Sequence, residues 1–239
     1  NAAAYTAVDM AEKESDLAFK INSEAPHFMT IASEKINSKL IHISTDFVFD
    51  GKKNTPYNTK DFVNPIGIYG KSKVKGEQYV LQSNNSKTIR TSWLYGDIGK
   101  NFCITILRLH KERSQSNLPL CVVADQIGSP TSTYSLSKVC WKLLSSTLDF
   151  ETIPSLLHWC DSGVASWYDF AIAVGEIGIE IGLISKMAKV VPIKSSEYNT
   201  LAKRPNFSVL DSNETTKYLN TEPNYWRTEL YETMKKIII

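Results

Sequence analysis

Two side chains in the first third of the sequence have the types and the spacing needed for proton transfer. Tyr69 and Lys73 are four residues apart, so in a helix they would lie on one face, one turn apart. A phenol with an ordinary pKa of about 10 is a poor acid at neutral pH, and a neighbouring ammonium group lowers that pKa. The spacing therefore suits Tyr69 to act as a general acid.

A third side chain, Thr45, follows the short apolar stretch of residues 40–44. A hydroxyl at the end of a strand can hold a substrate oxygen by a hydrogen bond while a tyrosine delivers the proton. We therefore expect Thr45, Tyr69 and Lys73 to converge on one reacting carbonyl. Such a set describes the reduction of a carbonyl group by hydride.

A tyrosine four residues before a lysine also occurs by chance, and the sequence contains two further pairs: Tyr134 with Lys138, and Tyr231 with Lys235. Taken alone, such a pair more often lies on the exposed face of an amphipathic helix than in a catalytic site. Only Tyr69 follows a strand of buried type that ends in Ser-Thr-Asp. We interpret the other two pairs as structural.

Composition excludes several classes of protein. The 239 residues, 42% hydrophobic and 22% charged, can form one large globular domain or two joined ones. A net charge of +2 without a run of like charges argues against a nucleic-acid partner. No apolar segment approaches the roughly 18 residues of a membrane span. The four cysteines are widely spaced, which predicts free thiols in a reducing, cytoplasmic compartment and neither a disulfide frame nor a metal site.

The elements around the three residues alternate between helix and strand. Residues 16–36 have a helical period with Ser15 as cap and a kink or split at Pro26, after a loop or short turn over residues 7–14. Asn22 lies near the apolar face, either as a helix-breaking residue or as a hydrogen-bond link between backbone and active site. The buried strand over residues 40–44 then completes half of a βαβ unit.

The rest of the chain continues this alternation. We expect turn-rich loops over residues 50–64 and 125–131, where parallel strands end and ligands bind. Helices are expected over residues 69–81, 101–113 and 135–148, from a serine cap at Ser166, and from about Trp226. Strands are expected from Thr88, over residues 120–123 and over residues 156–159.

Seven blocks in order along the chain resemble the dTDP-4-dehydrorhamnose reductase family of extended short-chain dehydrogenases/reductases. They are residues 1–9, 44–51, 69–73, 90–96, 125–131, 166–170 and 204–205. The resemblance implies a Rossmann-like doubly wound parallel sheet, incomplete at its start, with a small C-terminal α+β substrate lobe. It divides the chain into residues 1–165, mainly NAD(P)-binding, and residues 166–239, mainly substrate-binding, with residues 97–131 contributing to that lobe.

The resemblance also implies an activity. The C4 ketone of a dTDP-bound 6-deoxy-4-keto sugar would be reduced by hydride from NADPH or NADH, which is the last step of dTDP-L-rhamnose synthesis. Tyr69 would be the general acid, Lys73 would hold the nicotinamide ribose and tune Tyr69, and Thr45 would bind the carbonyl oxygen. The partners are then a dTDP-sugar and, as an open option, a second copy of the chain.

Further site residues are implied by matching position. The cofactor set is Ala2, Ala3, Tyr5, Thr6, Ser44, Tyr69, Lys73 and Trp93. The substrate set is Val8, Thr45, Asp46, Phe47, Trp93 and Arg204. The planar fork of Arg204 suits a diphosphate, and it equally suits a structural ion pair.

The sequence departs from the family pattern in two places. Phe47 stands where many relatives have tyrosine, which removes one hydroxyl contact. The glycine-rich turn that holds a cofactor pyrophosphate is not found, so the sequence resembles the family without its first roughly 60 residues, the length of about two βα units. We expect these 239 residues alone to bind dinucleotide poorly and to show no NADPH-dependent turnover.

Two other functions fit parts of the pattern. One is a different sugar-nucleotide reductase or epimerase of the same superfamily, against which Trp93 and residues 125–131 favour the rhamnose branch. The other is a non-catalytic binding or regulatory relative. The complete set of Thr45, Tyr69 and Lys73 argues against it, and the missing glycine-rich turn argues for it.

Overall fold

The computed structural model describes residues 1–145 and 150–238. The chain divides into two compact units, and each unit is assembled from three separate segments. Unit 1 comprises Asn1–Ser92, Lys138–Trp159 and Thr200–Glu222; unit 2 comprises Trp93–Ser137, Cys160–Asn199 and Pro223–Ile239. Within the described ranges, no helix is both long and apolar enough to cross a bilayer.

Unit 1 is built on a parallel sheet with the strand order β1-β2-β7, which confirms the predicted α/β class. Its strands are β1 (Leu40–Thr45), β2 (Ser86–Thr91) and β7 (Leu156–His158). Ile43 pairs with Ile89, which in turn pairs with Leu157. β2 is buried along its whole length, as expected for a strand that is covered on both faces. The backbone N–H of Ile43 also donates to the carbonyl of Asn1, which lies along the other edge of β1.

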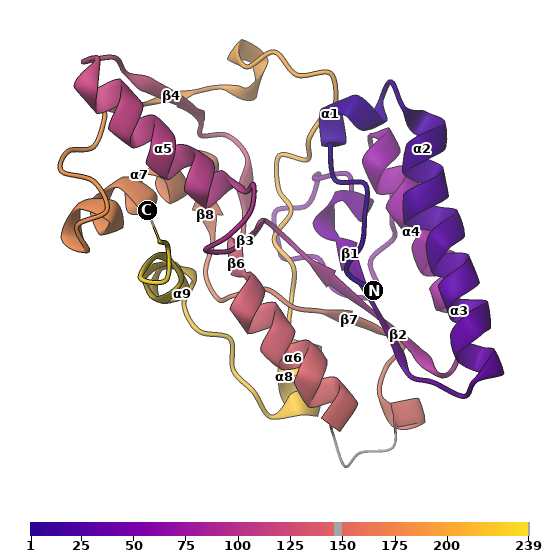
Figure 1. Ribbon diagram of the computed structural model, residues 1–239. Helices are drawn as coiled ribbons and strands as arrows, with labels where there is room; N and C mark the ends of the chain where they lie inside the picture. The colour runs from indigo at the N-terminus through magenta and orange to yellow at the C-terminus, as the bar shows by residue number, and fades with distance from the viewer. Residues whose placement is uncertain (146–149, 239) are drawn as a thin grey trace. The chain divides into compact units, whose positions relative to one another are not determined.

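Short helical elements surround this sheet. They are α1 (Val8–Ala11), α2 (Ser15–Phe19), the π-helical turn η1 (Lys20–Glu24), α3 (Ala25–Lys35), the 3-10 turns η2 (Asp46–Val48) and η3 (Phe150–Thr152), α4 (Ile68–Val80) and α8 (Asn213–Leu219). α3 and α4 pack side by side and both contact β1 (Figure 1). α6 (Thr133–Ser145) starts in unit 2 and continues into unit 1, and the last three residues of its predicted range lie outside the described residues.

The predicted helix over residues 16–36 is split, as Pro26 led us to expect. Pro26 occupies the first turn of α3, where its missing N–H costs nothing, and the π-helical turn η1 joins α3 to α2. The prediction of Ser15 as the cap is wrong. The helix already begins at Ser15, and Glu14 stands at the cap without a side-chain hydrogen bond.

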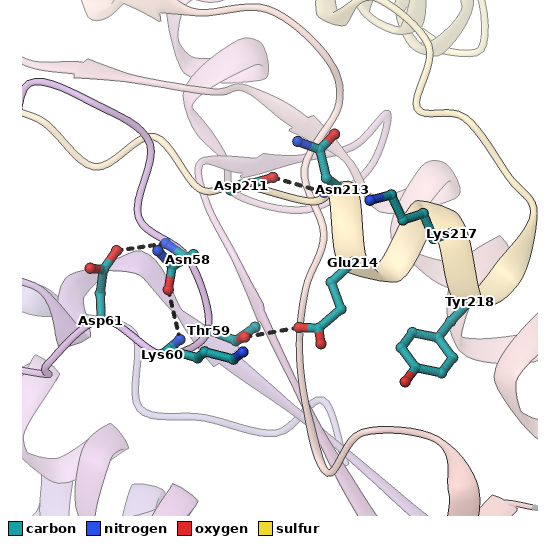
Figure 2. A pocket seen from close by; sticks show the side chains of 9 residues that line it. All are labelled: Asn58, Thr59, Lys60, Asp61, Asp211, Asn213, Glu214, Lys217 and Tyr218. Atoms are coloured by element: carbon teal, nitrogen blue, oxygen red, sulfur yellow. Dashed lines mark hydrogen bonds between the residues drawn. The ribbon is translucent and has the colours of Figure 1, made fainter.

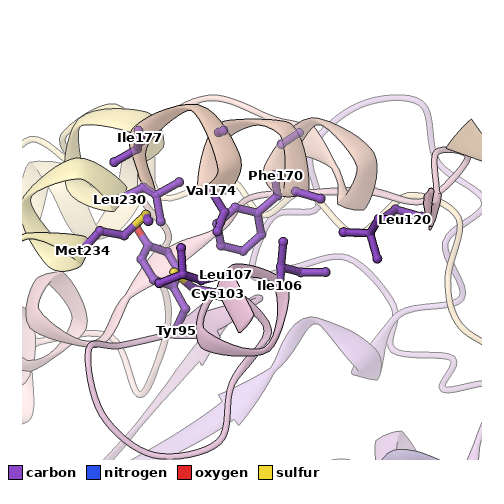
Figure 3. Packing of buried hydrophobic residues seen from close by; sticks show 14 of the residues in the cluster. Tyr95, Cys103, Ile106, Leu107, Leu120, Phe170, Val174, Ile177, Leu230 and Met234 are labelled. Carbon is purple, nitrogen blue, oxygen red and sulfur yellow. The ribbon is translucent and has the colours of Figure 1, made fainter. Parts of the chain in front are cut away.

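Unit 2 has its own core between three helices. They are α5 (Phe102–Gln115), α7 (Trp167–Glu180) and α9 (Trp226–Met234). Tyr95, Leu107, Phe170 and Leu230 meet there and are almost completely buried (Figure 3). The helix predicted to open after Ser166 is confirmed. Ser166 and Asp169 form a capping box, in which each side chain accepts a hydrogen bond from the other residue's backbone N–H.

The strands of unit 2 are short. They are β3 (Leu94–Tyr95), β4 (Leu120–Val123), β5 (Ile127–Gly128), β6 (Thr131–Ser132), β8 (Ala165–Ser166) and β9 (Val190–Ile193), and the 3-10 turn η4 (Ser195–Glu197) follows β9. β3 pairs with β6 and β4 pairs with β9 in parallel, whereas β5 and β8 are antiparallel. The loop predicted over residues 125–131 therefore contains a two-residue strand, β5, and ends at the start of β6.

Candidate active site

Two neighbouring elements of unit 1, β1 and α4, bring the predicted catalytic side chains together. Thr45 ends β1, whereas Tyr69 and Lys73 lie one turn apart on α4. The Tyr69 phenol lies close enough to the Thr45 hydroxyl for that hydroxyl to lower its pKa. The Lys73 Nζ donates to the carbonyl oxygen of Ile43 at 2.7 Å, two residues before Thr45. The cluster thus lies at the carboxyl end of β1, the edge at which parallel sheets bind ligands.

Local backbone geometry fixes the Thr45 hydroxyl. Thr45 is the cap of η2, so its Oγ1 accepts a hydrogen bond from the backbone N–H of Phe47 at 3.2 Å. The same hydroxyl lies 3.0 Å from Oδ1 of Asp46, to which it donates. Burial raises the pKa of Asp46 to about 6, against smaller lowering contributions from hydrogen bonds with Ser208 and Thr45.

Two glycines allow α4 to approach its neighbours closely. A Cβ atom at Gly70 would lie 2.2 Å from the carbonyl oxygen of Phe47, and one at Gly76 would lie 2.1 Å from the carbonyl oxygen of Asn22. At the start of the helix, the Glu12 carboxylate accepts a hydrogen bond from the Ile68 N–H at 2.8 Å. Sequence reasoning missed Glu12 because it lies 56 residues from the helix end that it caps.

Of the two interpretations of Asn22, the structure shows the hydrogen-bond link between backbone and active site. Its Oδ1 accepts from the Tyr5 N–H at 2.8 Å, and its Nδ2 donates to the Tyr5 carbonyl at 3.1 Å and to Oγ of Ser72 at 3.0 Å. Ser72 precedes Lys73 on α4. One buried amide therefore ties the segment around Tyr5 to the helix that carries Tyr69 and Lys73.

The charges of the site do not follow the simplest expectation. Burial raises the pKa of Tyr69 to about 12, and the nearby Asp46 carboxylate adds to this, against the lowering effect of the Thr45 hydrogen bond. Burial also lowers the pKa of Lys73 to about 8. The expectation that Lys73 lowers the pKa of Tyr69 is therefore wrong for this structure. The Lys73 ammonium is directed at the Ile43 carbonyl, and desolvation of the phenol dominates.

A buried ion pair lies one further turn along α4. The Glu77 carboxylate accepts hydrogen bonds from Nε and Nη2 of Arg90 at 2.9 and 2.7 Å, and both side chains are almost fully buried. The Glu77 charge opposes the lowering of the Lys73 pKa by burial. Sequence reasoning missed Glu77, although its spacing of four residues after Lys73 places it on the same helix face.

The residues predicted to bind substrate divide between the units. In unit 1, the Phe47 ring meets the Tyr69 ring edge-on at 5.5 Å between centroids, and Val8 begins α1. Arg204 forms an ion pair with Asp9 at 2.6 Å, so the structural role that its chemistry allowed is present. Trp93 belongs to unit 2, where its ring stacks on Trp167.

Among the residues predicted to bind cofactor, Ser44 offers an unused polar group. Ala2, Ala3 and Thr6 are exposed, and the Tyr5 hydroxyl donates to Glu14. Oγ of Ser44 and Oγ1 of Thr91, at the carboxyl ends of β1 and β2, are buried without a hydrogen-bond partner among the described residues. Unpaired buried hydroxyls are uncommon unless a ligand or water uses them, so these groups fit a polar ligand at this edge of the sheet.

A separate hollow in unit 1 does not overlap with the predicted site. Its volume is about 770 Å³ and its lining is polar (Figure 2). The residues that line it are Asn58, Thr59, Lys60, Asp61, Asp211, Asn213, Glu214, Lys217 and Tyr218. Hydrogen bonds within the lining, such as that from Thr59 to Glu214 at 2.9 Å, already engage several of these groups.

Fold and site together define a class. The features are those of a Rossmann-like short-chain dehydrogenase/reductase. They are a parallel α/β sheet, a threonine at a strand end, and a tyrosine and a lysine one turn apart on the following helix. The profile of the family described as "RmlD substrate binding domain" matches residues 1–239. The chain belongs to this family.

Named relatives agree with this assignment. A dTDP-4-dehydrorhamnose reductase of Aggregatibacter actinomycetemcomitans is 38% identical over 96% of this chain and 78% of its own length. The spore coat polysaccharide biosynthesis protein SpsK of Bacillus subtilis is 39% identical over 99% of this chain and 78% of its own length. The crystal structure of the Bacillus anthracis dTDP-4-dehydrorhamnose reductase in complex with NADP matches with a TM-score of 0.85 and 37% identity, over 97% of this chain and 77% of that chain. These matches confirm the predicted family and the Rossmann-like fold.

Proposed function

We propose that the protein reduces dTDP-4-dehydrorhamnose to dTDP-L-rhamnose with NADPH. The observation that carries this proposal is the convergence of Thr45, Tyr69 and Lys73 at the carboxyl end of β1, in a chain of this family. Relatives with the same activity name and a homologous structure with NADP support the substrate and the cofactor.

Thr45, Tyr69 and Lys73 each have a separate role in the reaction. Bound NADPH would supply hydride to C4 of the keto sugar. Thr45 would turn its hydroxyl proton from Asp46 to the C4 oxygen and hold it by a hydrogen bond, and Tyr69 gives its proton to that oxygen as negative charge develops there. With its pKa raised to about 12, Tyr69 keeps its proton at neutral pH and is available as a donor. Lys73, charged below a pKa of about 8, donates to the Ile43 carbonyl and so holds α4 against the strand end that carries Thr45.

We assign the remaining side chains by position. Ala2, Ala3, Tyr5, Thr6, Ser44 and Trp93 contact the cofactor together with Tyr69 and Lys73, and Lys73 holds its ribose. Val8, Asp46, Phe47, Trp93 and Arg204 contact the sugar nucleotide. The unpartnered hydroxyl of Ser44 supports its assignment, and the half-buried Arg204 can bind a diphosphate if its pair with Asp9 opens. Residues 1–165 mainly bind the cofactor, and residues 166–239 with 97–131 mainly bind substrate.

The setting of the enzyme is part of the proposal. The four cysteines are free thiols, which supports a reducing, cytoplasmic location. A homodimer fits the exposed apolar side chains of Phe28 and Ile31 on α3 and of Ile36 just after it. Light scattering on the purified protein measures the oligomeric state, and a monomer at every concentration would contradict the dimer.

An isotope experiment tests the reaction. The full-length protein is incubated with dTDP-4-dehydrorhamnose and NADPH that carries deuterium at both C4 positions of the nicotinamide. The proposal predicts dTDP-L-rhamnose with one deuterium at C4 of the sugar. Consumption of the keto sugar without deuterium transfer, or transfer to another keto sugar only, would contradict it.

A further inference from the structure

His42 is a buried histidine that the proposed reaction does not use. It lies in β1, three residues before Thr45, and its side chain is completely buried. Nε2 of its ring lies 3.4 Å from Nζ of Lys73, and Nδ1 lies 3.0 Å from the side-chain amide of Asn1. Burial above all, together with the Lys73 charge, lowers the pKa of His42 to about 2, so the ring is neutral at physiological pH. A neutral imidazole offers one N–H and one nitrogen that accepts.

The charge of Lys73 decides which ring nitrogen carries the proton. With its pKa lowered to about 8, Lys73 is an ammonium group at neutral pH, and an ammonium group can only donate. Nε2 of His42 must therefore accept from Lys73, and the ring proton lies on Nδ1. The amide of Asn1 can present its oxygen to that proton. This orientation frees the backbone N–H of Ala3, which donates to Oδ1 of Asn1 at 3.1 Å and is exposed to water.

Two of the three protons on Lys73 Nζ are then held by β1. One is donated to the carbonyl oxygen of Ile43 at 2.7 Å, and the other to Nε2 of His42. Lys73 is almost completely buried, and its Nζ makes no other hydrogen bond within residues 1–145 and 150–238. A single bond to Ile43 would let the ammonium group swing about that bond. Two bonds to the same strand fix its position and, because the group is tetrahedral, the direction of its third proton.

An apolar side chain would fit the strand at position 42, since its neighbours are Ile41 and Ile43. It would leave a proton of a buried ammonium group without an acceptor, which is costly. We propose that His42 is a positioning residue of the active site, whose Nε2 holds the Lys73 ammonium together with the Ile43 carbonyl and so aims its third proton at the cofactor ribose. This inference rests on the proposed function, which assigns the ribose to Lys73.

A pair of variants separates the two ring nitrogens of His42. His42→Gln keeps a side-chain oxygen near the place of Nε2, whereas His42→Asn keeps a polar atom only near the place of Nδ1. Both are made in the full-length protein, and calorimetry measures the binding of NADPH and of its adenosine bisphosphate half, which lacks the nicotinamide ribose. We expect His42→Asn to bind NADPH about tenfold more weakly, the effect of one lost hydrogen bond, and to bind the half-molecule normally. His42→Gln should bind both ligands as the unmodified protein does.

Thr88→Val is the matched control. Thr88 pairs with His42 in the ladder between β1 and β2, and its buried hydroxyl has no hydrogen-bond partner among the described residues, so the variant should change the binding of neither ligand. Normal NADPH binding by His42→Asn would overturn the inference. Equal weakening of both ligands, or equal losses in His42→Asn and His42→Gln, would also overturn it, because His42 would then be structural only. Failure of the unmodified full-length protein to bind NADPH would overturn the proposed function, and the inference with it.

The tautomer of His42 can be measured in the unmodified protein. Nitrogen NMR on full-length protein with labelled histidine distinguishes a protonated from an unprotonated ring nitrogen, and the signals of His42 are those that His42→Gln lacks. At neutral pH we expect the proton on Nδ1 and an unprotonated Nε2. A protonated Nε2 would overturn the inference, because that nitrogen could not accept a hydrogen bond from the Lys73 ammonium.

Discussion

Burial sets the charge state of the individual groups around Tyr69. Asp46 has its pKa raised to about 6, Lys73 has its pKa lowered to about 8, and Tyr69 keeps its proton to about 12. Burial and the Lys73 charge lower the pKa of His42 to about 2, which makes it a neutral core histidine. The site therefore works with a protonated phenol, a charged lysine and a carboxylate that ionises only near neutral pH.

The raised pKa of Asp46 predicts a pH-dependent contribution to stability. The unfolded chain releases this proton near pH 3.9, whereas the folded protein holds it to about pH 6. The folded state binds more protons in this window, so the contribution of Asp46 falls as pH rises through it, by up to about 3 kcal/mol. Urea unfolding of the unmodified protein and of Asp46→Asn, at several values between about pH 4 and pH 7, measures this contribution to the free energy of unfolding. A difference between the two that does not change with pH would contradict the assignment.

Glu77→Gln should destabilise the protein strongly. It leaves the buried Arg90 guanidinium without its carboxylate, and breaking a buried pair from one side costs about 3–5 kcal/mol. Glu112→Gln breaks the exposed pair with Arg108 and is the control, with an expected loss of at most about 0.5 kcal/mol. Chemical denaturation of both variants gives the comparison. Equal and small losses in the free energy of unfolding for the two variants would show that the Glu77–Arg90 pair contributes little to stability.

At the scale of elements, α4 is the part that brings the site together. Its amino end is capped by Glu12, its face toward η2 carries Gly70, and its face toward η1 carries Gly76. Each glycine meets a backbone carbonyl that cannot rotate away. The position of Tyr69 and Lys73 relative to Thr45 therefore depends on close backbone contacts as well as on side-chain chemistry.

Gly70→Ala tests this dependence. The new methyl group would meet the Phe47 carbonyl at 2.2 Å, so α4 must shift by a fraction of an ångström beside Tyr69. We expect a loss of about 1–3 kcal/mol in the free energy of unfolding, despite the better helix propensity of alanine, and at least tenfold slower reduction. Lys71→Ala, at an exposed position of the same helix, should change neither quantity measurably. Unimpaired turnover by Gly70→Ala would show that the contact is not needed for the site.

The sequence predicted elements better than it predicted contacts. The hydrophobic period and the turn residues placed α4, β4, α7 and α9 within about two residues, because these signals are local. Three contacts that the sequence did not predict join residues 13 to 56 positions apart. They are the hydrogen bond of Glu12 to the start of α4, the close approach of Gly128 to the Trp93 ring, and the ion pair of Glu77 with Arg90. Such contacts depend on how the elements pack, which spacing along the chain does not encode. The prediction of a lowered pKa for Tyr69 was wrong for the same reason, because burial raises this pKa and the effect of burial exceeds that of the neighbouring lysine.

At the scale of the whole molecule, each unit has its own core and is built from interleaved segments. The chain crosses from one unit to the other at residues 92–93, 137–138, 159–160, 199–200 and 222–223. Neither unit is a single continuous stretch that could be cut out. We therefore expect both to unfold in one transition in calorimetry, and two separate transitions would contradict this.

A bound product should stabilise the whole chain. Ligand that binds only the folded state adds about 2.7 kcal/mol at one hundred times its Kd, which corresponds to a rise in Tm of about 5–10 °C for a protein of this size. dTDP-L-rhamnose should produce this shift in a thermal melt, whereas an unrelated nucleotide-sugar at the same concentration should produce much less. Equal shifts with both ligands would contradict recognition of the dTDP-sugar.

In the proposed carbonyl reduction, Tyr69 donates the proton. The most direct measurement compares the rate of NADPH consumption with dTDP-4-dehydrorhamnose for the full-length protein, its Tyr69→Phe variant and the control Tyr79→Phe on the same helix. Tyr69→Phe keeps the ring that meets Phe47 and loses only the hydroxyl, so we predict a fall in rate of about 10²–10⁴-fold with the fold intact. Tyr79→Phe should retain the full rate. If Tyr69→Phe reduced the keto sugar as fast as the unmodified protein, the account of this site would be wrong.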